Sequence, residues 1–237
     1  MDGENILSTT FDTLGINDEL LRGIYSYGFE NPSKIQGEAI PIINQGNDLI
    51  AQAQSGTGKT GAFLIGALNH IVPSEKETQV LILAPTHELV HQIYEVALEL
   101  SKYLEITIME VVGGTNVGEC RRGLDKLPQI IIGSPGRVLD MIQKNYLYTN
   151  KLKKLIFDEA DETLSYGFKE TVYNIVKSVP KNAQICLFSA TMPDEIIELS
   201  DNFMNRPEKI LVQKEALTLE GITQFYINMR IRIISFN

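Results

Sequence analysis

The sequence predicts an α/β domain in which helices sandwich a mostly parallel sheet. Short apolar runs alternate along the chain with segments whose apolar residues recur at helical spacing. The run at residues 79–84 is apolar at nearly every position, as expected of a strand that is covered on both faces. With 237 residues and a hydrophobic fraction of 43%, the chain can bury a sizeable core.

This alternation assigns the elements in order. A helical segment comes first, at residues 18–45, and is punctuated by Pro32 and Pro41. Strands are predicted at residues 48–53, 79–84, 106–112, 129–133, 153–158, 183–188 and 209–213. Helices are predicted from the glycine-rich turn to about residue 70, and at residues 86–103, 117–126, 136–145, 168–178 and 193–203. The chain therefore divides into an N-terminal extension (1–45), an α/β domain (46–213) and a connector or tail (214–237).

Composition narrows the class of protein. The chain carries 21 basic and 30 acidic residues, a net charge of -9, which excludes a simple basic nucleic-acid binder but leaves room for a local basic surface. Cys120 and Cys186 are far apart and predict ordinary thiols. The acidic N-terminus predicts no signal peptide, and no run approaches the roughly 20 apolar residues of a membrane span. We expect a soluble intracellular monomer that binds no membrane.

Residues 53–60, Ala-Gln-Ser-Gly-Thr-Gly-Lys-Thr, lie between a predicted strand and a predicted helix. In that context the pattern predicts a phosphate-binding loop, in which Gly56 and Gly58 let backbone N–H groups close around phosphate oxygens. Lys59 can reach the terminal phosphates, and the hydroxyl of Thr60 can ligate Mg²⁺. The alternative is a glycine-rich turn with an incidental lysine. The loop residues predicted to contact a nucleotide are Gln54, Ser55, Gly56, Thr57, Gly58, Lys59 and Thr60.

A second candidate follows the apolar strand at residues 153–158, where three carboxylates fall within four positions. Asp158 is placed to hold Mg²⁺, and Glu159 to orient or deprotonate an attacking water. Asp161 can hydrogen-bond a neighbouring strand end, for which Ser189 and Thr191, after another apolar strand, are the candidates. The alternative for the carboxylates is a solvated acidic turn, and that for the two hydroxyls is ordinary helix capping.

Asp158–Asp161 spells Asp-Glu-Ala-Asp, the signature of the DEAD-box RNA helicases, and the sequence resembles that family over residues 10–229. Residues 28–36 resemble the family's adenine-reading Q motif. The resemblance implies a RecA-like P-loop NTPase domain that uses ATP and Mg²⁺, and it is closest to the subgroup that acts in translation initiation. The family motifs for RNA contact are matched at Pro85, Thr86, Gly113, Gly114, Ser134 and Arg137.

The resemblance also implies roles in base recognition. Gln36 would pair with the adenine edge, Phe29 belongs to the same motif, and Phe11 matches its isolated upstream aromatic residue, which would stack on the base. The alternative for Phe11 is a hydrophobic staple before the helix start at residues 17–18.

Three positions depart from the family. His87 replaces the usual arginine, which predicts weaker RNA binding, whereas Thr163 and Tyr166 replace the usual methionine and basic residue with no consequence that the sequence assigns.

The family has two RecA-like domains, and only the first is matched here. We therefore predict that this chain binds nucleotide, binds single-stranded RNA weakly and hydrolyses little ATP alone. Translation-initiation scaffold proteins are candidate partners, and the cytoplasm is the expected compartment, with the nucleus as the alternative. Three other functions remain open: a non-enzymatic module that competes for helicase partners, an exon-junction-type relative, and a P-loop ATPase that acts on something other than nucleic acid.

Overall fold

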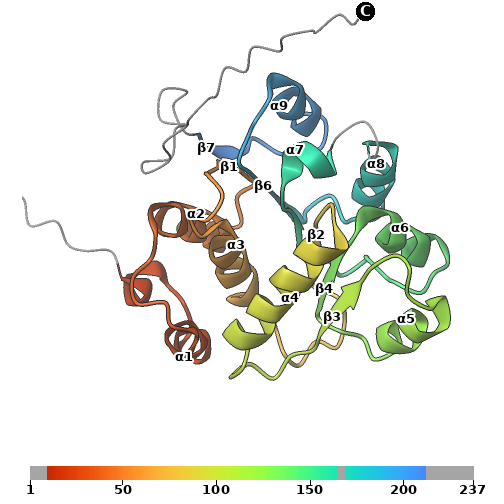
Figure 1. The fold of residues 1–237 in the computed structure, drawn as a ribbon, viewed down its shortest axis with the longest axis horizontal. Helices are drawn as coiled ribbons and strands as arrows, with labels where there is room; N and C mark the ends of the chain where they lie inside the picture. The colour runs from red at the N-terminus through yellow and green to blue at the C-terminus, as the bar shows by residue number, and fades with distance from the viewer. Residues whose placement is uncertain (1–9, 165–168, 212–237) are drawn as a thin grey trace, which may run out of the picture.

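A computed structural model describes residues 10–164 and 169–211 (Figure 1). Its centre is a seven-stranded sheet in the order β3-β4-β2-β5-β6-β1-β7, and every pairing is parallel. The strands are β1 (Leu49–Gln52), β2 (Val80–Leu83), β3 (Ile108–Val111), β4 (Ile130–Gly133), β5 (Lys154–Phe157), β6 (Gln184–Ser189) and β7 (Glu208–Ile210). All seven predicted strands are confirmed. The connector or tail at residues 214–237 and Tyr166 lie outside the described residues.

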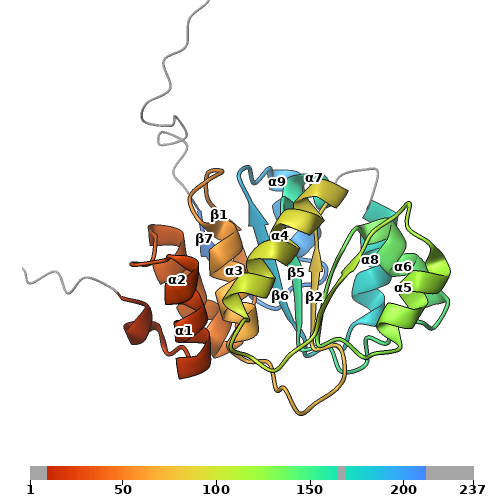
Figure 2. The ribbon, with the colours of Figure 1, turned by 60° about the horizontal axis from the view of Figure 1, so that its bottom comes forward.

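Helices cover both faces of the sheet (Figures 1 and 2). The elements on the first face are η1 (Phe11–Leu14), α1 (Asp18–Tyr27), α2 (Lys34–Gln45), α3 (Lys59–Leu68) and α4 (His87–Leu100). Those on the second face are α5 (Val117–Leu124), α6 (Pro135–Gln143), α7 (Ala160–Thr163), α8 (Lys169–Ser178) and α9 (Asp194–Ser200). Successive strand residues alternate between the two cores: Leu49 joins the first and Ile50 the second. This double burial explains why the strands are apolar at almost every position.

The N-terminal helical segment contains two helices separated by a turn. Gly28 ends α1 in the left-handed conformation, at a φ of 101°, and Ser33 begins α2 just after Pro32. Pro41, by contrast, lies inside α2 and does not end it. A proline removes one helical hydrogen bond, and close packing of α2 on α3 keeps the helix continuous past it. The short elements η1 and α7 were not predicted from the sequence.

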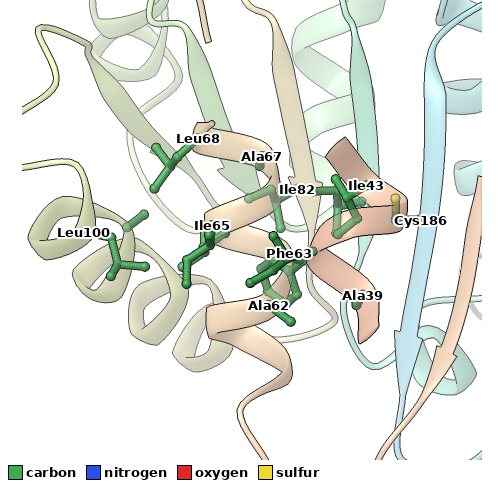
Figure 3. Close-up of a cluster of buried hydrophobic side chains, with 14 of the residues drawn as sticks. Ala39, Ile43, Ala62, Phe63, Ile65, Ala67, Leu68, Ile82, Leu100 and Cys186 are labelled. Atoms are coloured by element: carbon green, nitrogen blue, oxygen red, sulfur yellow. The ribbon is translucent and has the colours of Figure 1, made fainter. Parts of the chain in front are cut away.

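Helix α3 is buried on almost every side, and Figure 3 shows its apolar side chains packed among those of neighbouring helices and strands. A Cβ at Gly66 would lie 2.7 Å from Ile43 Cγ2, so α2 and α3 approach at a distance that only glycine permits. Phe63 of α3 packs against Phe188 of β6, with ring centroids 5.3 Å apart. Within the part of the chain that the structure describes, no helix combines the length and the apolar content of a bilayer span.

Candidate nucleotide and RNA site

The strand order brings the predicted site residues together at the carboxyl ends of the strands. Strands β5 and β6 lie between β1 and β2, although they come later in the sequence. The carboxyl ends of β1, β5 and β6 therefore carry the nucleotide candidates side by side, and those of β2, β4 and β3 carry the RNA candidates. In open parallel sheets this edge is where ligands bind.

The phosphate loop has the backbone that phosphate binding requires. Gly56 and Gly58 have φ values of 79° and 97°, in the left-handed region that glycine adopts freely, and α3 begins at the next residue. Lys59 is buried, and its ammonium group donates a hydrogen bond to the Ala53 carbonyl at 2.9 Å. Its Nζ also lies 3.8 Å from Glu159 Oε1. A positive charge is thus held inside a loop at a helix N-terminus, an arrangement that favours an anion.

The other residues of the phosphate loop differ in their contacts and exposure. The hydroxyl of Thr57 donates to the Gln54 carbonyl at 2.7 Å and closes the turn. Ser55 is exposed at the tip, whereas Thr60, in the first turn of α3, is half-buried. The predicted contacts of the Ser55 and Thr60 hydroxyls with a nucleotide or Mg²⁺ stay predictions.

The predicted adenine-reading residues contact the phosphate loop and the helix that follows it. Gln36 is buried, its Nε2 donates to the Gly58 carbonyl at 3.2 Å, and its Oε1 accepts the Ser33 N–H at 2.9 Å. Phe29 lies against the start of α3, since a Cβ at Gly61 would be 3.0 Å from Phe29 Cε2. These contacts hold the segment at residues 29–36 against the phosphate loop and the start of α3.

Phe11 does not offer a face to a base in this structure. Its side chain is fully buried and stacks on Phe29, with ring centroids 6.2 Å apart and planes 18° apart, while Tyr25 packs edge-on at 6.3 Å. Burying a ring of this size is strongly favourable, so its apolar packing overrides the predicted stacking on adenine. The role of Phe11 here is to support Phe29 from behind.

Asp158 has an unusual environment for a carboxylate. The residue is 4% exposed, and its Oδ1 accepts the N–H of Glu159 at 3.0 Å. Burial, followed by the neighbouring charge of Glu159, raises the pKa of Asp158 to about 6. A nearby cation would oppose both effects and favour the ionised form.

The available oxygen ligands suit magnesium. Thr60 and Asp158 offer a hydroxyl and a carboxylate, and Mg²⁺ is commonly held by one or two such groups together with substrate phosphates and waters. Among residues 10–164 and 169–211, no group of three or more His, Cys, Asp or Glu side chains is arranged to hold a metal ion. Magnesium held by Thr60 and Asp158 would take its remaining ligands from nucleotide phosphates and water.

Glu159 adopts a backbone conformation that the sequence does not reveal. Its φ of 43° and ψ of 61° are left-handed, which is rare for a residue with a Cβ and is found preferentially at functional sites. It precedes the four-residue helix α7, and its carboxylate faces Lys59. No local sequence signal predicts this geometry, because glutamate is not a residue that favours positive φ.

Asp161 connects β5 and β6 through hydroxyl donors. The Ser189 hydroxyl donates to Asp161 Oδ1 at 2.6 Å, and the Thr191 hydroxyl donates to Oδ2. Gln52, at the end of β1, donates to the Ala190 carbonyl at 3.3 Å and ties the phosphate-loop strand to the same segment. The predicted coupling of Asp161 to Ser189 and Thr191 is confirmed as a contact, and Gln52 is an addition that the sequence did not suggest.

The candidate RNA-contact residues lie in a row of turns at the carboxyl ends of β2, β3 and β4. The Thr86 hydroxyl accepts the N–H of Leu89 and caps α4, directly after the half-buried Pro85. The exposed His87 lies beside the next turn, since a Cβ at Gly113 would be 3.3 Å from His87 Nε2. The two segments that follow β2 and β3, both predicted to contact RNA, therefore lie side by side.

The motif after β4 joins the same row. Arg137 donates to both the hydroxyl and the carbonyl of Thr115, at 2.9 and 3.0 Å, which links α6 to the turn containing Gly114. Gly114 has a φ of 76°, so the turn needs glycine there. Ser134 is largely buried at the N-cap of α6. Thr115 was not among the predicted residues; its only signal is its position after the Gly-Gly pair.

Fold and site together define the class of protein. An all-parallel sheet, a glycine-rich loop opening a buried helix, and an acidic strand end beside that loop are the features of a P-loop NTPase domain of the RecA-like type. The chain belongs to the DEAD/DEAH box helicase family, whose model matches residues 33–199.

Individual relatives agree with this assignment. The chain is 50% identical to the ATP-dependent RNA helicase eIF4A of Candida albicans over 227 residues, and 52% identical to that of Neosartorya fischeri over 221 residues. These alignments cover 96% and 93% of the chain but 57% and 56% of the relatives. Among solved structures, Saccharomyces cerevisiae Dbp5 bound to RNA and ADP BeF3 matches with a TM-score of 0.84 and 33% identity, covering 91% of this chain and 55% of Dbp5. The chain thus spans a little over half the length of these relatives.

Proposed function

We propose that this chain forms the ATP-binding N-terminal half of an RNA helicase of the eIF4A type, which acts in translation initiation. The observation that carries the proposal is the convergence of the buried Lys59, the Asp158–Glu159 turn and the Asp161 hydroxyl contacts at adjacent strand ends. The names of the eIF4A relatives and the nucleotide in the Dbp5 structure support the same reading.

In this proposal each group has one task. The loop amides and Lys59 bind the phosphates, and Gln36 with Phe29 recognises adenine. Thr60 and Asp158 hold Mg²⁺, which would neutralise phosphate charge when bound. Glu159 orients the attacking water and accepts its proton. Its carboxylate lies 3.8 Å from the ammonium group of Lys59, which in this proposal binds the terminal phosphates.

The row of turns from Thr86 to Arg137 would bind the RNA backbone. Backbone amides at Gly113 and Gly114, the Ser134 position at a helix N-terminus and the Arg137 charge suit phosphates, and such contacts follow a strand without reading its sequence. Because His87 stands where the family motif that the sequence resembles has arginine, we propose weak RNA binding by this half. Scaffold proteins of translation initiation are the proposed partners, and the cytoplasm the proposed compartment.

We further propose that hydrolysis needs a second RecA-like domain. Arginine residues supplied across such an interface increase the rate of phosphoryl transfer by about 10³–10⁵-fold. This chain alone would then bind nucleotide but turn it over very slowly. A P-loop ATPase unrelated to nucleic acid is disfavoured, because the turns after β2, β3 and β4 would have no task.

Binding of a fluorescent ADP analogue tests the nucleotide site. We expect saturable binding that is strengthened by Mg²⁺ and is displaced by ATP more effectively than by GTP. Lys59→Ala removes the ammonium group and is expected to abolish the binding, whereas Lys144→Ala, at an exposed ion pair, leaves it unchanged. Equal binding by wild type and K59A would contradict the nucleotide site.

Steady-state ATP hydrolysis tests the proposed division of labour. We expect negligible turnover by this chain with or without single-stranded RNA, and RNA-stimulated turnover when a second RecA-like domain from an eIF4A relative is supplied. Robust RNA-stimulated hydrolysis by the chain alone would show that it does not need the second domain.

A further inference from the structure

The left-handed backbone at Glu159 needs a cause in its surroundings. The φ angle of a residue is the rotation about its N–Cα bond, and this rotation sets the direction of the preceding carbonyl. At Glu159, φ is 43°, so a group that fixes the direction of the Asp158 carbonyl also helps to hold Glu159 in this strained conformation. Strained backbone persists where neighbouring groups fix it.

Thr163 holds that carbonyl. Its hydroxyl donates a hydrogen bond to the Asp158 carbonyl at 2.8 Å, and its backbone N–H donates to the Glu159 carbonyl at 2.8 Å. The Thr163 side chain is fully buried, so water does not replace its hydroxyl as a donor. One residue thus binds both peptide groups of the turn from the far end of α7.

The turn controls both carboxylates. Rotation of the peptide between residues 158 and 159 would remove the Glu159 N–H from Asp158 Oδ1, which it now reaches at 3.0 Å. The same rotation would redirect the Glu159 side chain, whose Oε1 lies 3.8 Å from Lys59 Nζ. Any group that fixes the peptide plane therefore fixes the two acidic side chains relative to the phosphate loop.

We infer that Thr163 is a positioning residue that holds the Asp158–Glu159 turn in the strained conformation in which its carboxylates meet a bound nucleotide and its Mg²⁺. The inference deepens the proposed function and rests on it. It also assigns a consequence to one of the three positions at which the sequence departs from its family. If Thr163 only stabilised the fold, replacing it would lower the stability of the chain but would leave the gain in nucleotide affinity from Mg²⁺ unchanged.

Thr163→Val, Thr163→Ser and Thr149→Val separate these roles. Valine keeps the shape and removes the donor, while serine keeps the donor. Thr149 is the matched control, because it is also buried and its hydroxyl also donates to a backbone carbonyl, that of Ser178, at 2.6 Å. For each variant, the dissociation constant of a fluorescent ADP analogue is measured with Mg²⁺ and with EDTA, and circular dichroism reports folding.

The ratio of the two dissociation constants is the readout. Since one buried hydrogen bond shifts an equilibrium by about fivefold, we expect T163V to reduce the gain in affinity from Mg²⁺ by about fivefold. T163S and T149V are expected to stay near the wild-type ratio. A wild-type ratio in T163V, or an equal loss in T149V, overturns the inference. If T163V does not fold, Thr163→Cys, a weak donor of similar size, is judged by the same criteria.

Crystal structures of wild type and T163V provide a readout that does not depend on nucleotide. A negative φ at Glu159 in T163V supports the inference, and a retained positive φ overturns it. If wild type binds no nucleotide, the proposed function fails, and the φ of Glu159 still decides whether Thr163 holds the turn.

Discussion

Replacing Asp158 with asparagine is expected to stabilise the fold at neutral pH while weakening Mg²⁺-dependent nucleotide binding. Asp158 is 4% exposed, and burial together with the charge of Glu159 raises the pKa of its carboxyl group from the ordinary value of 3.8 to about 6. Asparagine has the same shape, and its Oδ1 can still accept the Glu159 N–H. The substitution therefore removes the cost of a buried charge and keeps the hydrogen bond that orients the turn.

The magnitude follows from the pKa. A tenfold change in a protonation equilibrium corresponds to about 1.4 kcal/mol, so ionised Asp158 lowers the free energy of unfolding by about 3 kcal/mol at pH 7.5. Because the folded-state pKa is the higher one, this penalty is absent below the unfolded pKa of 3.8, grows as the pH rises from there to about 6, and is nearly constant above that. The advantage of Asp158→Asn is expected to be about 3 kcal/mol at pH 7.5 and about half of that at pH 5.

Thermal and urea unfolding in EDTA, followed by circular dichroism at both pH values, measure this advantage. A gain of 3 kcal/mol corresponds to a Tm increase of about 6–12 °C for a chain of this size. Asp201→Asn, at an exposed position, is the control and is expected to change stability by less than about 0.5 kcal/mol. Equal or lower stability of D158N at pH 7.5, or a gain that does not shrink at pH 5, would refute the reasoning.

Three further predictions concern packing, base recognition and thiol reactivity. Gly23→Ala places a Cβ 2.0 Å from the Leu100 carbonyl oxygen and is expected to destabilise the fold by about 1–3 kcal/mol in urea unfolding; an unchanged midpoint would contradict this close approach. Gln36→Ala is expected to reduce the preference for ATP over GTP by about tenfold in competition binding, and an unchanged preference would separate Gln36 from base recognition. Burial raises the pKa of Cys186 to about 12, so in a Cys120→Ser background we expect no labelling by a thiol reagent at pH 8 until the chain unfolds; rapid native-state labelling would contradict that burial.

The local features of the site were predictable from the sequence. The phosphate loop, the acidic strand end and the paired hydroxyls at Ser189 and Thr191 are each short segments, and the chemistry of a short segment depends on residue type and spacing. The positions of the strands were predictable for the same reason. A short apolar run that is bounded by turn residues is typical of a buried strand.

Features that depend on neighbours in space were not predictable. Phe11 was expected to meet a base, but the burial available beside Phe29 encloses its ring. Pro41 was expected to punctuate a helix, but packing against α3 keeps α2 continuous. The left-handed Glu159 and its support by Thr163 have no sequence signature, because a hydrogen bond across a turn decides them.

By itself, the sequence determined the α/β class, the seven strands and the candidate residues for phosphate, metal and RNA contact, because periodicity and side-chain chemistry are properties of the chain. Only the tertiary structure decided that β5 and β6 insert between β1 and β2, which brings Asp158, Asp161 and Ser189 beside the phosphate loop. Strand order follows from how helices cover both faces of one sheet, a global packing problem whose solution no single segment contains.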